Sequence, residues 1–386
     1  MPLHGFPRKV IWGEDALEAL HSILSEEGVD SIVVVTDKVV GDLEGVRRII
    51  RGLEERGIRV SIYDSVPPEP PFDVADRIAG LVRESGAGAI VAIGGGSVID
   101  AAKAGLVKAV RPDTDLHDVA PFNPLGLDAS RLLLIAIPTT SGTGSDASHG
   151  MVLTETVEGK RRKIALAHYD LVPYATILDH TLPASAPKHL YLWTALDALA
   201  HAVEALASTG ATPFSDALAL HAAEIIFVNL KRALEGDDEA RSLIHAAATM
   251  AGMAFTNGGL GLAHAIAHPL GAALHTHHGA TVGIVLPRVV ELNYSDAGAR
   301  KKYETLKSVL ENIDGLPRAS SLTEHLYRLY EKVGAPRGLR DLGVEREKVE
   351  DVAAWVAEEA LHDPDIAYAP VVPSPEELEK LILSLY

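Results

Sequence analysis

Histidines gather in one short stretch of the chain, Gly261 to Gly279, which holds five of the seventeen histidines. The residues between them are mostly small or apolar, and such surroundings favour the neutral imidazole that binds a metal ion. His264 and His268 are four residues apart, so they would share one face of a helix. The stretch is therefore a candidate metal site, although a buried helix with hydrogen-bonded histidines would give the same pattern.

A carboxylate and an imidazole at the same spacing, Asp197 and His201, lie in a second apolar segment. A buried carboxylate without a partner is costly, and either a divalent cation or an Asp–His hydrogen bond would remove that cost. Together with His264 and His278, the pair makes a set of one oxygen and three nitrogen ligands. Such a set suits Fe²⁺ or Zn²⁺ and, with one position open, can polarise a substrate oxygen.

A glycine-rich turn follows the apolar run Ala89–Ile93. Its glycines let the backbone approach an anion, and the helix that follows offers free N–H groups at its positive end. The turn predicts a phosphate or pyrophosphate site, although a tight structural turn accounts for it equally well. The third glycine of the G-x-G-x-x-G fingerprint is absent. The residues of this candidate site are Gly94, Gly95, Gly96, Ser97 and Asp100.

A second loop, from Pro138 to Asp146, also follows a predicted strand and is rich in threonine, serine and glycine. Loops at the carboxyl ends of parallel strands are the usual ligand sites of open α/β sheets, so two of them on one edge favour a nucleotide site. Asp37 comes directly after another predicted strand. It could accept hydrogen bonds from a ribose and repel a 2′-phosphate, or it could be an exposed turn residue.

The elements that must position these residues fall into two halves. In the first half, short apolar runs alternate with amphipathic segments, which predicts a doubly wound, mostly parallel sheet covered by helices. Strands are expected at 9–12, 31–35, 59–63, 89–93 and 132–137, and helices at 14–27, 45–56, 74–85 and after residue 97. Beyond about residue 180, helices are expected at 189–207, 213–235, 238–256, 261–275, 281–293, 320–333, 346–360 and 375–385. We therefore predict an α/β dinucleotide-binding domain over residues 1–180 and an all-helical metal-binding domain over residues 181–386.

The composition excludes several function classes. With no cysteine among 386 residues, disulfides, thiolate metal sites and cysteine nucleophiles are excluded. The formal net charge of −18 argues against a nucleic-acid partner. No uncharged run approaches membrane-spanning length and the N-terminus has no apolar signal core, so we expect a cytoplasmic protein with no membrane partner.

The order and spacing of these motifs resemble the iron-containing (group III) alcohol dehydrogenase family over nearly the whole chain. The resemblance rests on Gly94–Lys103, Thr139–Asp146, Asp197 with His201, and the run from His264 through His268 to His278. It implies a fold shared with glycerol dehydrogenases and dehydroquinate synthases, with the active site in a cleft between the two domains. It also implies an enzyme that moves a hydride between a small alcohol and an aldehyde or ketone, using Fe²⁺ or alternatively Zn²⁺. The implied cofactor is NAD, with NADP not excluded, and a homodimer or higher homo-oligomer is expected.

The resemblance implies roles for individual residues as well. Asp197, His201, His264 and His278 correspond to the four metal ligands, and His268 corresponds to the catalytic histidine beside nicotinamide and substrate, through which the proton leaves. The other implied residues contact the cofactor: Gly94–Ser97 at the pyrophosphate, Thr139, Thr140, Thr143 and Lys163 elsewhere, and Asp37 at the position associated with NAD over NADP.

Four departures from the family pattern concern the substrate pocket. His277 stands where proline is usual, Gly150 and Glu69 stand where asparagine is common, and Leu361–Pro370 lacks the customary Asn-Pro-Arg ending. A glycerol dehydrogenase-like polyol oxidoreductase is the nearest alternative function. A dehydroquinate synthase-type lyase is disfavoured because its polyanionic substrate calls for lysine and arginine, which are scarce around the ligand helices. A non-catalytic nucleotide-binding protein with a structural metal is an equally weak alternative.

Overall fold

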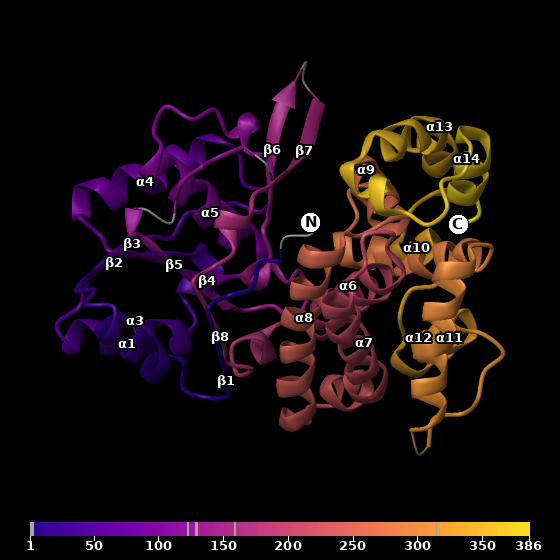
Figure 1. Cartoon of the computed structure of the whole chain (residues 1–386), viewed down its shortest axis with the longest axis horizontal. Coiled ribbons are helices and arrows are strands. Elements are labelled where there is room, and N and C mark those ends of the chain that lie inside the picture. The colour runs from indigo at the N-terminus through magenta and orange to yellow at the C-terminus, as the bar shows by residue number, and fades with distance from the viewer. Residues whose placement is uncertain (1–3, 122, 128–129, 158–159, 314) are drawn as a thin grey trace. The chain divides into compact units, whose positions relative to one another are not determined.

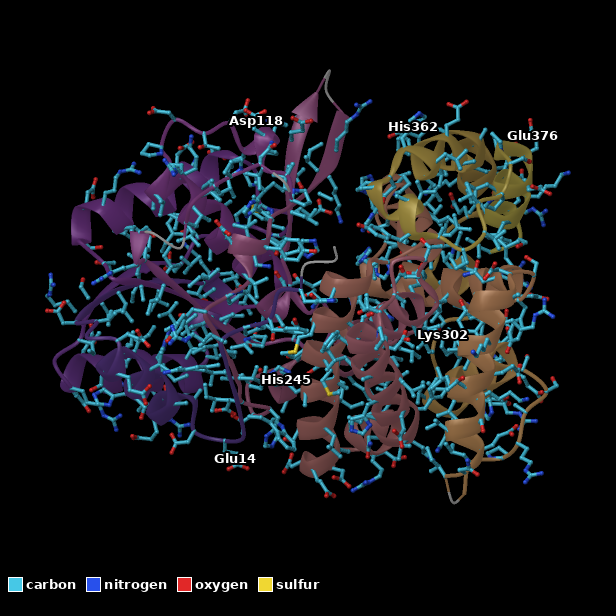
Figure 2. All side chains as sticks on the ribbon, viewed as in Figure 1. Glu14, Asp118, His245, Lys302, His362 and Glu376 are labelled. Atoms are coloured by element: carbon cyan, nitrogen blue, oxygen red, sulfur yellow. The ribbon has the colours of Figure 1, made fainter. Side chains whose placement is uncertain are left out.

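The structure, a computed structural model, describes residues 4–121, 123–127, 130–157, 160–313 and 315–386. It divides into two compact units, one ending at Ser185 and one running from Ala186 to Tyr386. Side chains fill the space between the helices and strands of each unit (Figure 2). Within the described residues, no helix is both long and apolar enough to cross a membrane.

The first unit contains a parallel sheet of six strands among its described residues, in the order β1-β8-β5-β4-β2-β3. Its central strands are continuous apolar runs because helices cover both faces. Figure 1 shows α4 and α5 on one face and α1 and α3 on the other, and each face has its own apolar core. The strands are β1 Lys9–Trp12, β2 Ser31–Val35, β3 Arg59–Tyr63, β4 Ala89–Gly94, β5 Leu133–Pro138 and β8 Ala175–Leu178. The helices are α1 Ala16–Glu26, α2 Lys38–Gly41, α3 Glu44–Glu55, α4 Asp73–Ser85 and α5 Gly96–Val110.

A β-hairpin that the sequence reading did not predict extends from this unit (Figure 1). Its antiparallel strands are β6, Gly150–Val157, and β7, Lys160–Ala167. The proline-rich loop lies beside it, since Pro71 forms a single parallel bridge with Thr154 of β6. Strand β8 was also missed, although it lies between β1 and β5 in the sheet.

The second unit is helical throughout its described residues, as the sequence predicts. Helix α6 is at its centre: nearly all of its residues are buried, and α7, α8, α10 and α11 pack around it. The helices are α6 Lys188–Ala207, α7 Pro213–Leu234, α8 Asp238–Gly258, α9 Leu262–Leu274, α10 His278–Asn293, α11 Ala297–Glu311, α12 Leu322–Val333, α13 Arg346–His362 and α14 Pro375–Leu383. Two details differ from the prediction: α10 begins three residues earlier, at His278, and α11 was not predicted.

Candidate metal centre and nucleotide loops

The buried helix α6 carries the carboxylate at the centre of the histidine cluster. Asp197 and His201 are one turn apart and both are buried. Nε2 of His201 lies 3.9 Å from Oδ1 of Asp197. The predicted spacing therefore places both side chains on one stripe of the helix, as expected for residues four apart.

Two other helices bring histidines to the same carboxylate oxygen. Nε2 of His264, on α9, lies 3.6 Å from Oδ1 of Asp197, and Nε2 of His278, at the start of α10, lies 3.5 Å from it. Gly279 makes the second approach feasible, because a Cβ atom there would lie 2.2 Å from the carbonyl oxygen of Trp193 on α6. Only glycine lets α10 begin so close to α6.

The arrangement fits a divalent cation. Ligand atoms in tetrahedral coordination at the usual distance of about 2.1 Å from an ion are about 3.4 Å from one another. The three distances to Oδ1 of Asp197, from 3.5 to 3.9 Å, lie just above that value. Within the described part of the chain, neither Oδ1 of Asp197 nor Nε2 of His264 has a hydrogen-bond partner although both are buried. Two orphaned polar atoms that face each other are what an ion between them would satisfy.

The electrostatics of this cluster also favour a positive charge. Burial alone would raise the pKa of the Asp197 carboxyl, but His201, His278 and His264 together lower it. Burial likewise disfavours the charged imidazole of His264, yet Glu204 and Asp197 outweigh it and raise its pKa to about 10. The metal-free site therefore attracts a proton, which a bound metal ion would displace.

Glu204 is a buried residue of this site that the sequence analysis did not single out as functional. It lies on α6, one turn beyond His201, and accepts a hydrogen bond from Nδ1 of His264. Its other oxygen accepts from the backbone N–H of Ala263, 2.7 Å away, in the first turn of α9. The contact fixes the His264 ring with Nε2 directed at Asp197. The only sequence feature that could have indicated a role for Glu204 is its position, three residues after His201.

His268, the predicted catalytic histidine, is one turn beyond His264 and half-buried. Its ring stacks on that of His278, with 5.2 Å between centroids. Nδ1 of His268 lies 2.8 Å from Oδ2 of Asp363, another residue that the sequence analysis did not assign. The structure therefore brings His268 beside the predicted metal ligands.

The two predicted nucleotide loops lie against each other at the carboxyl ends of β4 and β5. A Cβ atom on Gly96 would lie 2.8 Å from Cγ2 of Thr143, and one on Gly95 would lie 3.4 Å from Cγ2 of Thr140. Gly95 is the N-cap residue of α5. The first backbone N–H groups of α5, which have no acceptor within the helix, lie at this edge of the sheet. The backbone N–H of Thr139, directly after β5, donates to the carbonyl oxygen of Gly94. Gly96 is therefore required for the packing of the two loops, and both glycines leave room for the close approach of a ligand.

Asp100 and Lys103, on α5, hold the second loop at Ser145 and also hold the residues that follow the loop. Asp100 accepts from Oγ of Ser145 and, at 2.9 Å, from the backbone of Val152. Lys103 is fully buried and donates to the carbonyl oxygens of Ser148 and Gly150 at 2.9 and 2.6 Å. Burial lowers the pKa of Lys103 to about 8 despite the nearby carboxylates. Both oxygens of Asp100 are thus engaged with protein.

The other two predicted cofactor residues lie elsewhere on this unit. Asp37 follows β2, at the same edge of the sheet as the two loops, and its Oδ1 caps α2 by accepting from Val40 N at 2.9 Å. Lys163 lies on the hairpin, in β7, and forms a 3.1 Å ion pair with Glu69 of the proline-rich loop.

Comparisons with known proteins cover both units. The family described as iron-containing alcohol dehydrogenase matches residues 7–180, and its C-terminal part, described as the Fe-containing alcohol dehydrogenase family, C-terminal, matches residues 191–386. An alcohol dehydrogenase of Thermococcus barophilus is 34% identical over 385 residues, which cover 99% of this chain and 98% of that protein. An NADPH-dependent butanol dehydrogenase of Clostridium saccharobutylicum is 31% identical over 98% of this chain and 97% of that protein. The structure of an iron-containing alcohol dehydrogenase from Thermococcus thioreducens superposes with a TM-score of 0.88 at 33% identity, over 100% of this chain and 99% of that one.

Proposed function

The chain belongs to the iron-containing alcohol dehydrogenase family, and we propose that Asp197, His201, His264 and His278 hold the metal ion of this alcohol–carbonyl oxidoreductase. One observation carries the proposal. Three imidazole nitrogens surround a single buried carboxylate oxygen at 3.5 to 3.9 Å. The family name supports Fe²⁺ as the ion, and the ligand set also suits Zn²⁺.

When bound, the metal ion would supply Lewis-acid polarisation of the substrate oxygen, and the nicotinamide cofactor would supply the hydride acceptor. The protein's own groups do the rest. His268, half-buried beside His278, takes up at Nε2 the proton that alcohol oxidation releases, and returns it in the reverse reaction. The apolar surroundings of α6 and α9 keep water away from Asp197, His201 and His264 and strengthen each charge interaction there.

For the cofactor, we propose that the backbone from Gly94 to Ser97 binds the pyrophosphate at the N-terminus of α5. The open N–H groups of that helix support this assignment. Thr139, Thr140 and Thr143 lie on the loop packed against these glycines and would contact the remainder of the dinucleotide. Asp100 contributes indirectly, by holding that loop through Ser145. Lys163, on the hairpin, is proposed as a further contact.

The carboxylate of Asp37 supports a preference for NAD, because a negative charge beside the ribose repels a 2′-phosphate. One relative is named as NADPH-dependent, so the two cofactors need direct comparison. We also propose a homo-oligomer. Its support is the edge strand β1, whose exposed side chains include Val10 and Trp12.

The proposed function can be tested on protein purified without oxygen. Metal content is measured, and the protein is then reconstituted with Fe²⁺ or Zn²⁺ and assayed with NAD and NADP over a panel of primary alcohols, diols, glycerol and the matching aldehydes. We expect one metal ion per chain and a change in absorbance at the NADH band with at least one substrate. Asp197→Asn should lose both, whereas Asp351→Asn, at an exposed position on α13, should lose neither. No turnover of any alcohol or aldehyde by the metal-loaded protein would contradict the proposal.

A further inference from the structure

The contact between His268 and Asp363 joins residues 95 positions apart. Asp363 follows α13 and begins the 3₁₀ turn Pro364–Tyr368, which packs on α9. Its side chain is 11% exposed, and that of His268 is 21% exposed. The two groups therefore meet where water competes only weakly for the hydrogen bond, which strengthens it.

Asp363 is itself held in place. Its Oδ1 accepts from the backbone N–H of Asp365 at 2.9 Å, which leaves Oδ2 directed at His268. Burial opposes the charged form of this carboxyl, but the hydrogen bond from His268 lowers the pKa of Asp363 below its ordinary value. A carboxylate can only accept, so Nδ1 of His268 must be the nitrogen that carries the proton.

The neighbouring rings restrict His268 further. Its ring is stacked within 15° of parallel on His278 and meets His264 edge-on, with 6.0 Å between centroids. Those contacts fix the plane of the ring but not which nitrogen bears the proton. The hydrogen bond between Nδ1 and Asp363 distinguishes the two nitrogens.

We propose that Asp363 is a positioning residue for His268: it fixes the imidazole with its proton on Nδ1, so that Nε2 remains the proton acceptor during alcohol oxidation. The inference rests on the proposed role of His268. It assigns a function to the segment 361–370, which departs from the family's Asn-Pro-Arg ending. Removing the acceptor should impair proton transfer while leaving metal binding intact, because Asp363 touches none of the proposed ligands.

Asparagine is the informative replacement. It preserves the size of the side chain and can still cap the 3₁₀ turn, but its amide N–H would donate to Nδ1 and move the ring proton to Nε2. By analogy with a protease triad in which the same change imposes the wrong tautomer, Asp363→Asn should lower kcat by about 10²- to 10⁴-fold. Asp363→Glu, which keeps the acceptor, should recover part of the loss. KM for the alcohol should change little.

A double-mutant cycle separates positioning from general structural damage. In the His268→Ala background, Asp363→Asn should lower kcat by less than about two-fold, because residues that act through one another are non-additive. An equal loss in both backgrounds would overturn the proposal. So would a fall in metal content below that of the wild type. Asp351→Asn serves as the matched control on α13.

A readout independent of activity is the tautomer itself. In ¹⁵N-histidine-labelled protein, metal-free and zinc-loaded, the His268 resonances are assigned by their absence in His268→Gln. Nδ1 should show the shift of a protonated nitrogen and Nε2 that of an unprotonated one, and Asp363→Asn should reverse them. A proton on Nε2 of His268 in the wild-type protein would overturn the proposal.

Zinc content gives a second check. If the wild type binds a second zinc ion per chain and Asp363→Asn does not, the proposal is also overturned, because His268, Asp363 and Asp365 would then be zinc ligands. If the wild type lacks dehydrogenase activity, the proposed function fails while the ¹⁵N measurement still decides the tautomer.

Discussion

The two carboxylate oxygens of Glu204 make two different structural contacts. One oxygen holds the His264 ring and the other holds the first turn of α9 through Ala263. A hydrogen-bonded carboxylate behind a ligand histidine fixes the tautomer and raises the basicity of the nitrogen that faces the metal. Glu204 therefore affects metal affinity without touching the ion.

Replacing Glu204 by Gln should lower metal affinity by about 10- to 100-fold, the usual effect of losing a partner of a ligand histidine. The amide keeps one oxygen for Ala263, so the helices should remain folded. Competition with a chromophoric chelator measures the affinity. Glu224→Gln is a matched control, because Glu224 accepts from Nδ1 of His221 in a similar pair on the exposed face of α7. Equal affinity losses in the two variants would rule out a specific role for Glu204.

His149, three residues after the second loop, should make the protein sensitive to acid. Burial, with Lys103 and His168 nearby, lowers its pKa to about 4, against about 6.5 for a free histidine. Between these values the unfolded chain binds the proton and the folded chain does not, so the free energy of unfolding falls as pH decreases from 6.5 to 4. The loss attributable to this residue is about 3 kcal/mol.

The variant His149→Phe keeps a ring that can stack on Tyr169 and removes the titration. Urea unfolding at a series of pH values should give similar free energies for both proteins, apart from a constant packing difference, above pH 7. Below pH 6.5 the variant should lose less stability than the wild type. Parallel curves down to pH 4 would show that His149 does not contribute.

The sequence allowed the set of metal-ligand candidates to be predicted, but not the carboxylates that hydrogen-bond to the histidines of the site. Asp197 with His201 and His264 with His268 are visible because each pair has helical spacing in an apolar segment. Glu204 has helical spacing from His201, but nothing in the sequence pairs it with His264, and Asp363 has no signal of this kind. Glu204 lies 60 residues before His264, and Asp363 lies 95 residues after His268. Only the packing of α6, α9 and the turn after α13 brings these side chains together.

At the scale of elements, the site depends on the close approach of α10 to α6. Two glycines allow it: a Cβ atom on Gly279 would meet the backbone of Trp193, and one on Gly283 would lie 3.1 Å from the side chain of Leu196. The first glycine is adjacent to His278. The position of this ligand is therefore set by helix packing rather than by its own side-chain contacts alone.

Gly279→Ala should push the first turn of α10 away from α6. We expect a loss of about 1–3 kcal/mol in the free energy of unfolding, typical of overpacking, and weaker metal binding because His278 moves away from Asp197. Gly80→Ala on α4 is the control, since a Cβ atom there has nothing within 4 Å and alanine favours a helix by about 1 kcal/mol. Thermal unfolding with and without metal measures both effects. Unchanged metal affinity in Gly279→Ala would contradict this account of His278.

Helix α11 and the hairpin β6–β7 were missed in the sequence for one physical reason. Helix α11 is strongly charged, and its buried positions reduce to Ala299, Tyr303, Leu306 and Leu310, so its apolar stripe is narrow. The hairpin β6–β7 projects from the sheet and lacks the long apolar runs of buried strands. By contrast, β2 and β4 are buried on both faces and were predicted within one residue. Periodicity therefore reports burial, and α11 and the hairpin escaped prediction because little of each is buried. Strand β8 is the exception: it is buried throughout but only four residues long.

At the scale of the whole molecule, the two proposed binding functions are divided between the two units. The proposed metal ligands all lie beyond Ala186, and the residues proposed to contact the dinucleotide all lie before Ser185. Each unit also has its own apolar core, apart from that of the other. Each ligand should therefore stabilise chiefly the unit that holds its contacts, because a ligand stabilises the structure that forms its site.

Hydrogen exchange read by mass spectrometry can resolve this division. A ligand at about 1,000 times its Kd stabilises its site by about 4 kcal/mol, so amides that exchange only when the site opens should slow by up to about 10³-fold. Zn²⁺ added to metal-free protein should slow exchange in α6, α9 and the start of α10. NAD added alone should instead slow exchange in residues 94–103 and 139–148. The Asp197→Asn variant should lose the first response and keep the second. Protection of the glycine turn by the metal alone, or of α6 by NAD alone, would contradict the assignment of the two sites to separate units.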